Sequence, residues 1–252
     1  IGVTGVQTCA LPIFLKTIKD SYFIAPFTLD SVAVNPQKAL KDLQGYDLAI
    51  IAKPTKAFDE NQIQVIDQFV LNGGKSIFLL DNVQADMDSL YNPTGEMLVY
   101  PKENGLGEML FKYGVRVNPD LIKDEMGSPI KLAVGQQGSE TVYEQFIWKF
   151  APFAVSQSNH PIVKNIEGVK FDFANSIDTL KNNIKKTVLL ASSPYSKKIG
   201  TPSVVNLGNT VNEKVDPKDM KPIDPAPLAV LLEGNFTSVY KNRIVPYKSE
   251  GF

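Results

Sequence analysis

The chain has 252 residues, of which 43% are hydrophobic, so it can bury a substantial core as one large domain or two small ones. It carries 26 Lys and Arg against 27 Asp and Glu, a balance that argues against a nucleic-acid-binding protein, which normally presents a basic face. No apolar run approaches the roughly 20 residues that cross a bilayer, so the sequence predicts a globular domain outside the hydrocarbon.

The first residues are predicted to be foreign to the protein. Residues 3–13, VTGVQTCALPI, resemble the in-frame translation of a common high-throughput sequencing adapter. On that interpretation residues 1–13 are a cloning or assembly scar to be left out of fold reasoning, and the natural chain starts near Phe14. The scar contains Cys9, the one cysteine of the sequence. The native protein is therefore expected to have no disulfide framework and no thiolate metal site.

An α/β pattern follows. Residues 23–29 predict a short strand and residues 36–43 a short helix. The apolar run 46–53, which ends before Pro54, has the length and isoleucine content of a buried strand.

The next helix has clear start and stop signals. Asp59 can cap it together with Gln62, apolar residues then repeat at helical spacing, and Gly73 ends it. Residues 75–80 predict another buried strand. Strand, helix and strand in this order imply a right-handed parallel crossover. We therefore expect an α/β domain over residues 14–125.

The remainder, residues 126–252, is predicted to be a β-rich continuation that extends the first sheet and is truncated at its C-terminus. Turn residues separate its candidate strands, which are residues 146–155, 169–173, 187–192, 203–207 and 226–232. Before this part, residues 92–107 read as a surface loop, residues 107–113 as a helix and residues 115–118 as a strand. Residues 209–227, rich in charge and proline, predict a long mobile loop.

Several sequence blocks together resemble a known family. They are DLAIIAKPTKAFDENQIQVIDQFVLNGGKSIFLLDNV, LFKYGVRVNPDLIKD, SNHPIVKNI, SIDTLKNNIKKTVLLASS and AVLLEGNFTSVYKNR. In this order and spacing the chain resembles the GldG family, the auxiliary subunits of gliding-motility-associated ABC transporters of Bacteroidota. The resemblance covers residues 22–246.

This resemblance implies a location and partners. It implies a periplasmic domain at the inner membrane, anchored by membrane helices that are missing here at both ends. It also implies ABC transporter permease and ATPase subunits as partners. From the residues themselves, neither a cofactor nor a nucleic-acid ligand is expected. The family's C-terminal portion is likewise missing from this sequence.

The first half is also similar to the Rossmann-like, class I glutamine-amidotransferase-like fold. An enzyme of that fold places Cys or Ser on a sharp strand-to-helix turn, and neither G-x-C-x-G nor G-x-S-x-G occurs here. Ligands of such sheets bind at the carboxyl ends of the strands, so Lys53, Thr55, Asp81 and Asn82 line the expected cleft. The favoured interpretation is that Asp81 and Asn82 form a turn and Lys53 is solvated, since fold analogy does not carry function.

Other chemistry-bearing residues predict no site. Asp81, Asp86 and Asp88 lack the Gly and terminal Glu of a calcium loop. His160 has no second His or Cys ligand, and a turn position is favoured for it. Trp148 and the nearby phenylalanines favour core packing over a partner-binding patch.

No catalytic, cofactor-binding or metal-binding residue is therefore predicted. The favoured function is a non-enzymatic accessory domain that binds a partner protein or a cargo for an ABC transporter. The alternative is a hydrolase or small-ligand-binding enzyme of the amidotransferase-like fold that uses Asp81 or His160.

Overall fold

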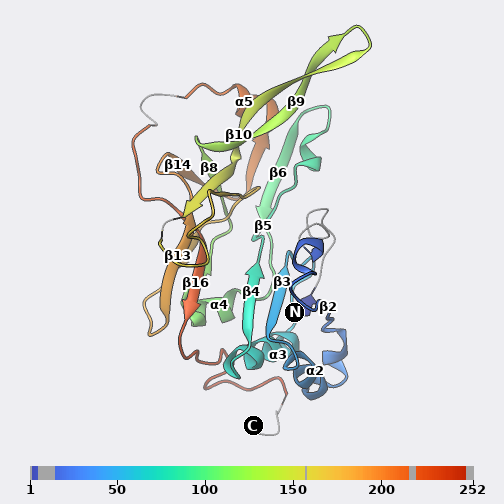
Figure 1. Cartoon of the computed structure of the whole chain (residues 1–252), viewed down its shortest axis with the longest axis vertical. Coiled ribbons are helices and arrows are strands. Elements are labelled where there is room, and N and C mark those ends of the chain that lie inside the picture. Colours follow the sequence, from blue (N-terminus) through green and yellow to red (C-terminus); the bar gives the residue numbers. More distant parts are fainter. Residues whose placement is uncertain (1, 5–14, 157, 216–219, 248–252) are drawn as a thin grey trace.

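The structure, a computed structural model, describes residues 2–4, 15–156, 158–215 and 220–247 (Figure 1). Its elements in chain order are β1 (Gly2–Thr4), β2 (Ala25–Pro26), η1 (Asp30–Ala33), α2 (Pro36–Leu43), β3 (Leu48–Ala52), α3 (Glu60–Leu71), β4 (Lys75–Leu79), β5 (Val83–Gln84), η2 (Asp88–Leu90), β6 (Glu96–Pro101), α4 (Gly107–Tyr113), β7 (Val115–Val117), β8 (Asp120–Asp124), β9 (Gly127–Gln137), β10 (Glu140–Ser156), β11 (Val169–Lys170), β12 (Ile177–Thr179), β13 (Lys185–Ala191), β14 (Ser196–Gly200), β15 (Ser203–Asn206), α5 (Leu207–Asn212) and β16 (Pro227–Glu233). Among the helices in these described ranges, none has the length and apolar character needed to cross a membrane.

Four parallel strands form the first sheet, in the order β2-β1-β3-β4. β1, which comes from the segment predicted to be an adapter scar, lies between β2 and β3. The remainder of that segment, Cys9 included, lies outside the described residues. The predicted strand over residues 23–29 is reduced to Ala25 and Pro26. Pro26 has no N–H with which to continue the ladder.

Side chains cap the starts of helices α2 and α3. Asn35 accepts a 2.9 Å hydrogen bond from the N–H of Lys38 at the start of α2, whose predicted bounds are confirmed. Asp59 accepts from the N–H of Gln62 (2.9 Å), and the Gln62 side chain accepts from the N–H of Asp59 (3.1 Å). This reciprocal pair is the predicted capping box of α3. α4 also has its predicted bounds.

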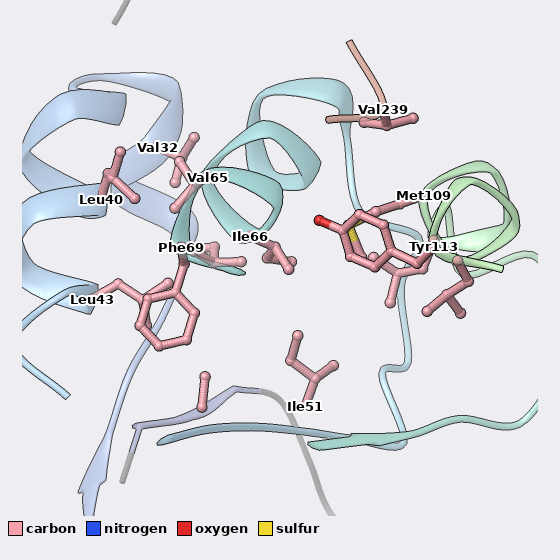
Figure 2. Packing of buried hydrophobic residues seen from close by; sticks show 14 of the residues in the cluster. Val32, Leu40, Leu43, Ile51, Val65, Ile66, Phe69, Met109, Tyr113 and Val239 are labelled. Atoms are coloured by element: carbon pink, nitrogen blue, oxygen red, sulfur yellow. The ribbon is translucent and has the colours of Figure 1, made fainter. Parts of the chain in front are cut away.

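The main core lies between α3 and the parallel sheet (Figure 2). Ile66 and Phe69 on α3 face the sheet, where Ile51 of β3 lies beneath them. Tyr113 from α4 and Val239 from the C-terminal segment complete this cluster. The core therefore combines residues from both ends of the described chain.

Strand β4 is half exposed, which corrects the prediction of a buried strand. Ile77 and Leu79 are 42% and 50% exposed. The reason is the sheet order, because β4 is the outer strand and has only β3 as a neighbour in its sheet. Sequence shows that a strand is apolar, but not where it lies in the sheet.

The strands after β4 are antiparallel and form separate sheets. A five-stranded sheet has the order β11-β10-β13-β16 with β9 paired to β10, a three-stranded sheet has the order β15-β6-β5, and two pairs are β7 with β12 and β8 with β14. No strand in the described part of the second half adds to the parallel sheet, so the predicted extension is wrong. Instead β12, β14 and β15 return to pair with β7, β8 and β6.

Two predicted loops contain regular structure. Residues 92–107 hold β6, in which Met97 and Val99 are buried and alternate with exposed residues as it pairs with β15. The predicted loop over residues 209–227 starts within α5, which ends at Asn212. Strands β8, β9, β12 and β14 were not predicted. β9 and β10 form a long hairpin that projects from the body at one end (Figure 1).

The aromatic cluster on β10 is part of a core, as favoured from sequence. Trp148 is fully buried and its ring lies 5.5 Å from that of Phe150 and 6.1 Å from that of Phe173. Phe153, on the same strand, is 44% exposed. The core-packing interpretation therefore holds for Trp148 and Phe150 and fails for Phe153.

Candidate functional site

A small cleft of about 170 Å³ opens at the carboxyl ends of β3 and β4. Lys53 follows β3 and Asp81 follows β4, and the Lys53 Nζ lies 3.4 Å from the Asp81 Oδ2. Both side chains are partly exposed. The other lining residues are Val83, Ala85, Asp86, Met87, Asp172 and Phe173. Two of the four predicted cleft residues thus meet, and the second half of the chain supplies the opposite wall.

The other two predicted residues do not line the cleft. Thr55 is exposed and is not among the residues that line the cleft. Asn82 is bound into the interior, because its Nδ2 donates to the Val117 carbonyl (2.8 Å) and its Oδ1 accepts from the Nδ2 of Asn104 (2.6 Å). Its N–H donates to the Oδ1 of Asn175 (2.7 Å). Asn82 therefore links Val117 of the first half to Asn175 of the second half.

The hydrogen bonds continue from Asn82 into the second half. Asn175 Nδ2 donates to the carbonyl of Asp120 (2.6 Å), and the Asp120 carboxylate accepts from both the N–H (2.8 Å) and the hydroxyl (2.6 Å) of Ser176. Ser176 is fully buried. A network of buried, fully hydrogen-bonded polar groups favours a single packing arrangement of the two halves. Any other arrangement would break a bond and leave a buried group unpaired.

The cleft concentrates unusual backbone conformations. Three non-glycine residues in the described part of the chain have a positive φ, and two of them, Lys53 (45°) and Phe173 (54°), line this cleft. The Lys53 N–H donates to the Leu79 carbonyl (2.7 Å), and the Phe173 N–H donates to the Phe150 carbonyl (2.8 Å). The left-handed region costs a side-chain-bearing residue about 1–2 kcal/mol, so the surrounding bonds hold both walls against local strain.

The charges of the cleft are largely paired within the protein. Asp172 lies 2.9 Å from the Nζ of Lys170, and the Oδ1 of Asp86 accepts from the N–H of Asp88 (2.8 Å). The ranges that the structure describes contain no group of three or more acidic, His or Cys side chains able to hold a metal ion. Outside the cleft lining, His160 accepts a 3.3 Å bond from the N–H of Ile162 in a turn. The arrangement can bind a small polar group and presents no nucleophile with an adjacent base among its lining residues.

The sequence could not have identified the inward role of Asn82 or the wall formed by Asp172 and Phe173. Those contacts join residues far apart along the chain. The local signal at Asn82, a polar residue at a strand end, fits a ligand-binding residue and a structural joint equally well.

Comparisons with known proteins give the chain a family. Residues 10–251 match the family described as "ABC-type uncharacterized transport system". An uncharacterized protein of Borreliella burgdorferi is 24% identical over 233 residues, which are 91% of this chain and 43% of that protein. The chain thus spans less than half the length of this relative.

A solved structure titled "mmIFT52 N-terminal domain" is similar over 76% of this chain and 72% of that one. The sequence identity is 16% and the TM-score is 0.49.

Proposed function

The chain belongs to the family of ABC-type uncharacterized transport systems, and from this premise we propose that it is a non-enzymatic auxiliary component that binds a partner protein or a cargo. The observation that carries the proposal is the family match over residues 10–251, nearly the whole chain. The auxiliary role in an ABC-type system follows from the family. That it acts by binding and without catalysis is our further proposal.

The structure of the cleft supports binding over catalysis. Asp81, the carboxylate that an enzyme of this fold could use, is paired with Lys53, and Asn82 is bound into the interior. His160 lies outside the cleft lining. No observation favours the alternative of a hydrolase.

We further propose a cellular location and transporter partners for the protein. The domain lies in the periplasm at the inner membrane, anchored by segments beyond the residues described here, and contacts the permease and ATPase subunits of a transporter that serves gliding motility. The resemblance of several sequence blocks to the GldG family supports this extension. We also propose that β1 to β4 with α2 and α3 form a Rossmann-like, class I glutamine-amidotransferase-like unit, which the parallel pairing of all four strands supports.

The test is to purify the full-length protein, tagged at its chromosomal locus, from membranes of the source bacterium in mild detergent. We expect mass spectrometry to find an ABC permease and its ATPase subunit at comparable amounts. An equally tagged, unrelated periplasmic protein serves as the control. Recovery of neither subunit above this control would overturn the proposal.

Asp81→Ala tests whether Asp81 has a role in transport beyond its ion pair with Lys53. A non-enzymatic subunit whose Asp81 only pairs with Lys53 should fold normally and recover the same transporter subunits. Normal recovery of the subunits together with loss of transport by the cells would instead show that Asp81 itself acts on a cargo, by binding it or by catalysis.

A further inference from the structure

The antiparallel sheet β15-β6-β5 carries apolar side chains on both of its faces. On the inner face, Met97 and Val99 of β6 are buried in a core cluster. On the outer face, Leu98 of β6 and Val204 of β15 lie directly opposite one another and are 60% and 63% exposed. Tyr100, two residues further along β6, is 49% exposed. Leu98, Tyr100 and Val204 form an outer patch, and none of them lines the candidate cleft.

The outer patch departs from the pattern of a sheet that faces water. Antiparallel sheets with one solvated face alternate apolar and polar residues along each strand, whereas residues 97–100 of β6 read MLVY, four apolar residues in a row. Single exposed apolar side chains are common on protein surfaces. Here two of them are paired across neighbouring strands and a third lies beside them on the same face. Such a contiguous group indicates a surface that another molecule covers.

A glutamate lies at each end of the part of β6 that carries the patch. Glu96 is on the same face of β6 as Leu98, because side chains alternate along a strand and these two are two residues apart. Glu103 follows the other end of β6 and is exposed. The outer face of β6 is thus apolar in its middle and bordered by negative charge.

The surrounding segment is acidic as well. Residues 83–103, which run from β5 through β6, contain four acidic residues and one basic residue. The basic residue, Lys102, donates a 2.7 Å hydrogen bond from its Nζ to the carbonyl of Pro54. Asp86 and Asp88 are exposed. The ion pairs between described residues include none of the four carboxylates, so these pairs do not neutralise the negative charge of the segment.

This charge selects among the molecules that could cover the patch. A second copy of the chain, docked through the same face, would bring Glu96 and Glu103 close to the same acidic residues of its neighbour. Like charges at an interface are unfavourable, and an anionic lipid surface is repelled for the same reason. A protein segment with apolar side chains flanked by lysine or arginine complements both the patch and its acidic border.

We propose that the outer patch is the docking surface for a subunit of the transporter, which presents to it apolar side chains flanked by lysine or arginine. This inference rests on the proposed function, because it takes the partner to be a subunit of an ABC-type transporter. Contact with the apolar patch supplies most of the binding energy. The acidic border favours a basic partner and speeds its association.

Paired threonine substitutions test the apolar part of the surface. Leu98→Thr with Val204→Thr removes apolar area from the patch and keeps residues that suit a strand. Val134→Thr with Tyr143→Thr is the matched control, because these two side chains are 46% and 62% exposed on the β9–β10 hairpin. Each tagged full-length variant is purified from membranes in mild detergent. Permease and ATPase subunits are then quantified relative to the tagged protein.

We expect the patch variant to recover about tenfold less of the subunits than the parent, and the hairpin control to match the parent. Equal recovery by the patch variant and the parent would overturn the docking surface while the proposed function stands. Recovery of neither subunit by the parent itself would overturn the proposed function, and the docking surface with it. The two failures are therefore distinguishable.

Charge reversal tests the acidic border. Glu96→Lys with Glu103→Lys should lower recovery by about fivefold at low salt, and added salt should narrow its difference from the parent because salt screens exposed charges. Glu140→Lys with Glu144→Lys, on the exposed hairpin, is the control and should match the parent. Equal loss in both charge-reversed variants would overturn the assigned border.

Photo-crosslinking identifies the occupant without removing the patch. A benzophenone amino acid replaces Tyr100 in the full-length protein, and Tyr143 is replaced in the control. We expect the crosslink at position 100 to reach a transporter subunit, at apolar residues flanked by lysine or arginine, and the control to give no such product. A crosslink to a second copy of this chain, to another part of the same chain or to an acidic segment would overturn the proposal. So would the lack of any crosslink in a preparation that still contains the subunits.

Discussion

The phenol of Tyr113 donates a 2.8 Å hydrogen bond to the carboxylate of Asp67, and both side chains are buried. The same carboxylate accepts from the hydroxyl of Ser238 (2.6 Å) and from the N–H of Val239 (3.2 Å). One buried charge thus joins α3, α4 and the C-terminal segment. Burial, followed by the negative charge of Asp67, raises the pKa of Tyr113 above its ordinary value, so the phenol stays protonated and remains a donor.

Asp67→Asn tests this junction. An amide presents an NH₂ group to partners that are themselves donors, so we expect the free energy of unfolding to fall by about 2 kcal/mol. Ser238→Ala removes only one of the donors and should cost about 1 kcal/mol. Urea denaturation with a common m-value measures both. An Asp67→Asn variant as stable as the parent chain would show that the carboxylate is not the anchor.

The strain at the cleft can be measured at Lys53. Lys53→Ala removes the ion pair with Asp81 and keeps a side chain at φ 45°, whereas Lys53→Gly removes both the pair and the strain. The exposed pair contributes at most about 1 kcal/mol. We therefore expect the Gly variant to be more stable than the Ala variant by about 1 kcal/mol, the reverse of the usual order. Thermal and urea unfolding give the comparison, and the usual order, with Ala the more stable, would contradict the strained backbone.

Acid should weaken the contact that Glu213, just after α5, makes with Lys123 of β8 and Lys149 of β10. A hydrogen bond from Lys123, with the charges of Lys123 and Lys149, lowers the pKa of Glu213 below 4.5, although burial opposes the shift. A carboxyl whose pKa is depressed by folding stabilises the protein above its unfolded pKa. That contribution is lost as the pH falls through the lower, folded pKa.

Glu213→Gln should accordingly reduce stability at pH 7 and lose its effect toward acid. The measurement is the urea midpoint of parent and variant from pH 7 down to about pH 3, which spans the ordinary pKa of the carboxyl. Glu140→Gln, at the exposed start of β10, is the control. A difference between parent and Glu213→Gln that stays constant down to the lowest pH would contradict the assigned ionisation.

The elements predicted correctly from sequence are those with local causes. The start of α3 depends on Asp59 and Gln62, three residues apart, and the start of α2 on Asn35 and Pro36. Such signals act within one turn of helix and need no knowledge of the fold. Strand β10 is predicted only over residues 146–155 and not in its full length, since the exposed part of the hairpin has no core periodicity.

The site was only half predictable for a related reason. Lys53 and Asp81 follow from the rule that parallel strands end at one edge, which a βαβ pattern already implies. The inward turn of Asn82 depends on Asn175, and the opposite wall depends on Phe173, both from the second half of the chain. The burial of β4 was misjudged because sheet order is set by the whole topology.

The return of β12 and β14 to β7 and β8 has a consequence for biosynthesis. β7 and β8 receive their strand partners only after residues 177–179 and 196–200 have been made. Long-range antiparallel pairing of this kind slows folding and leaves strand edges open in the meantime. The first half of the nascent chain therefore leaves the ribosome with unpaired strands, and during that interval chaperones have the greatest opportunity to act.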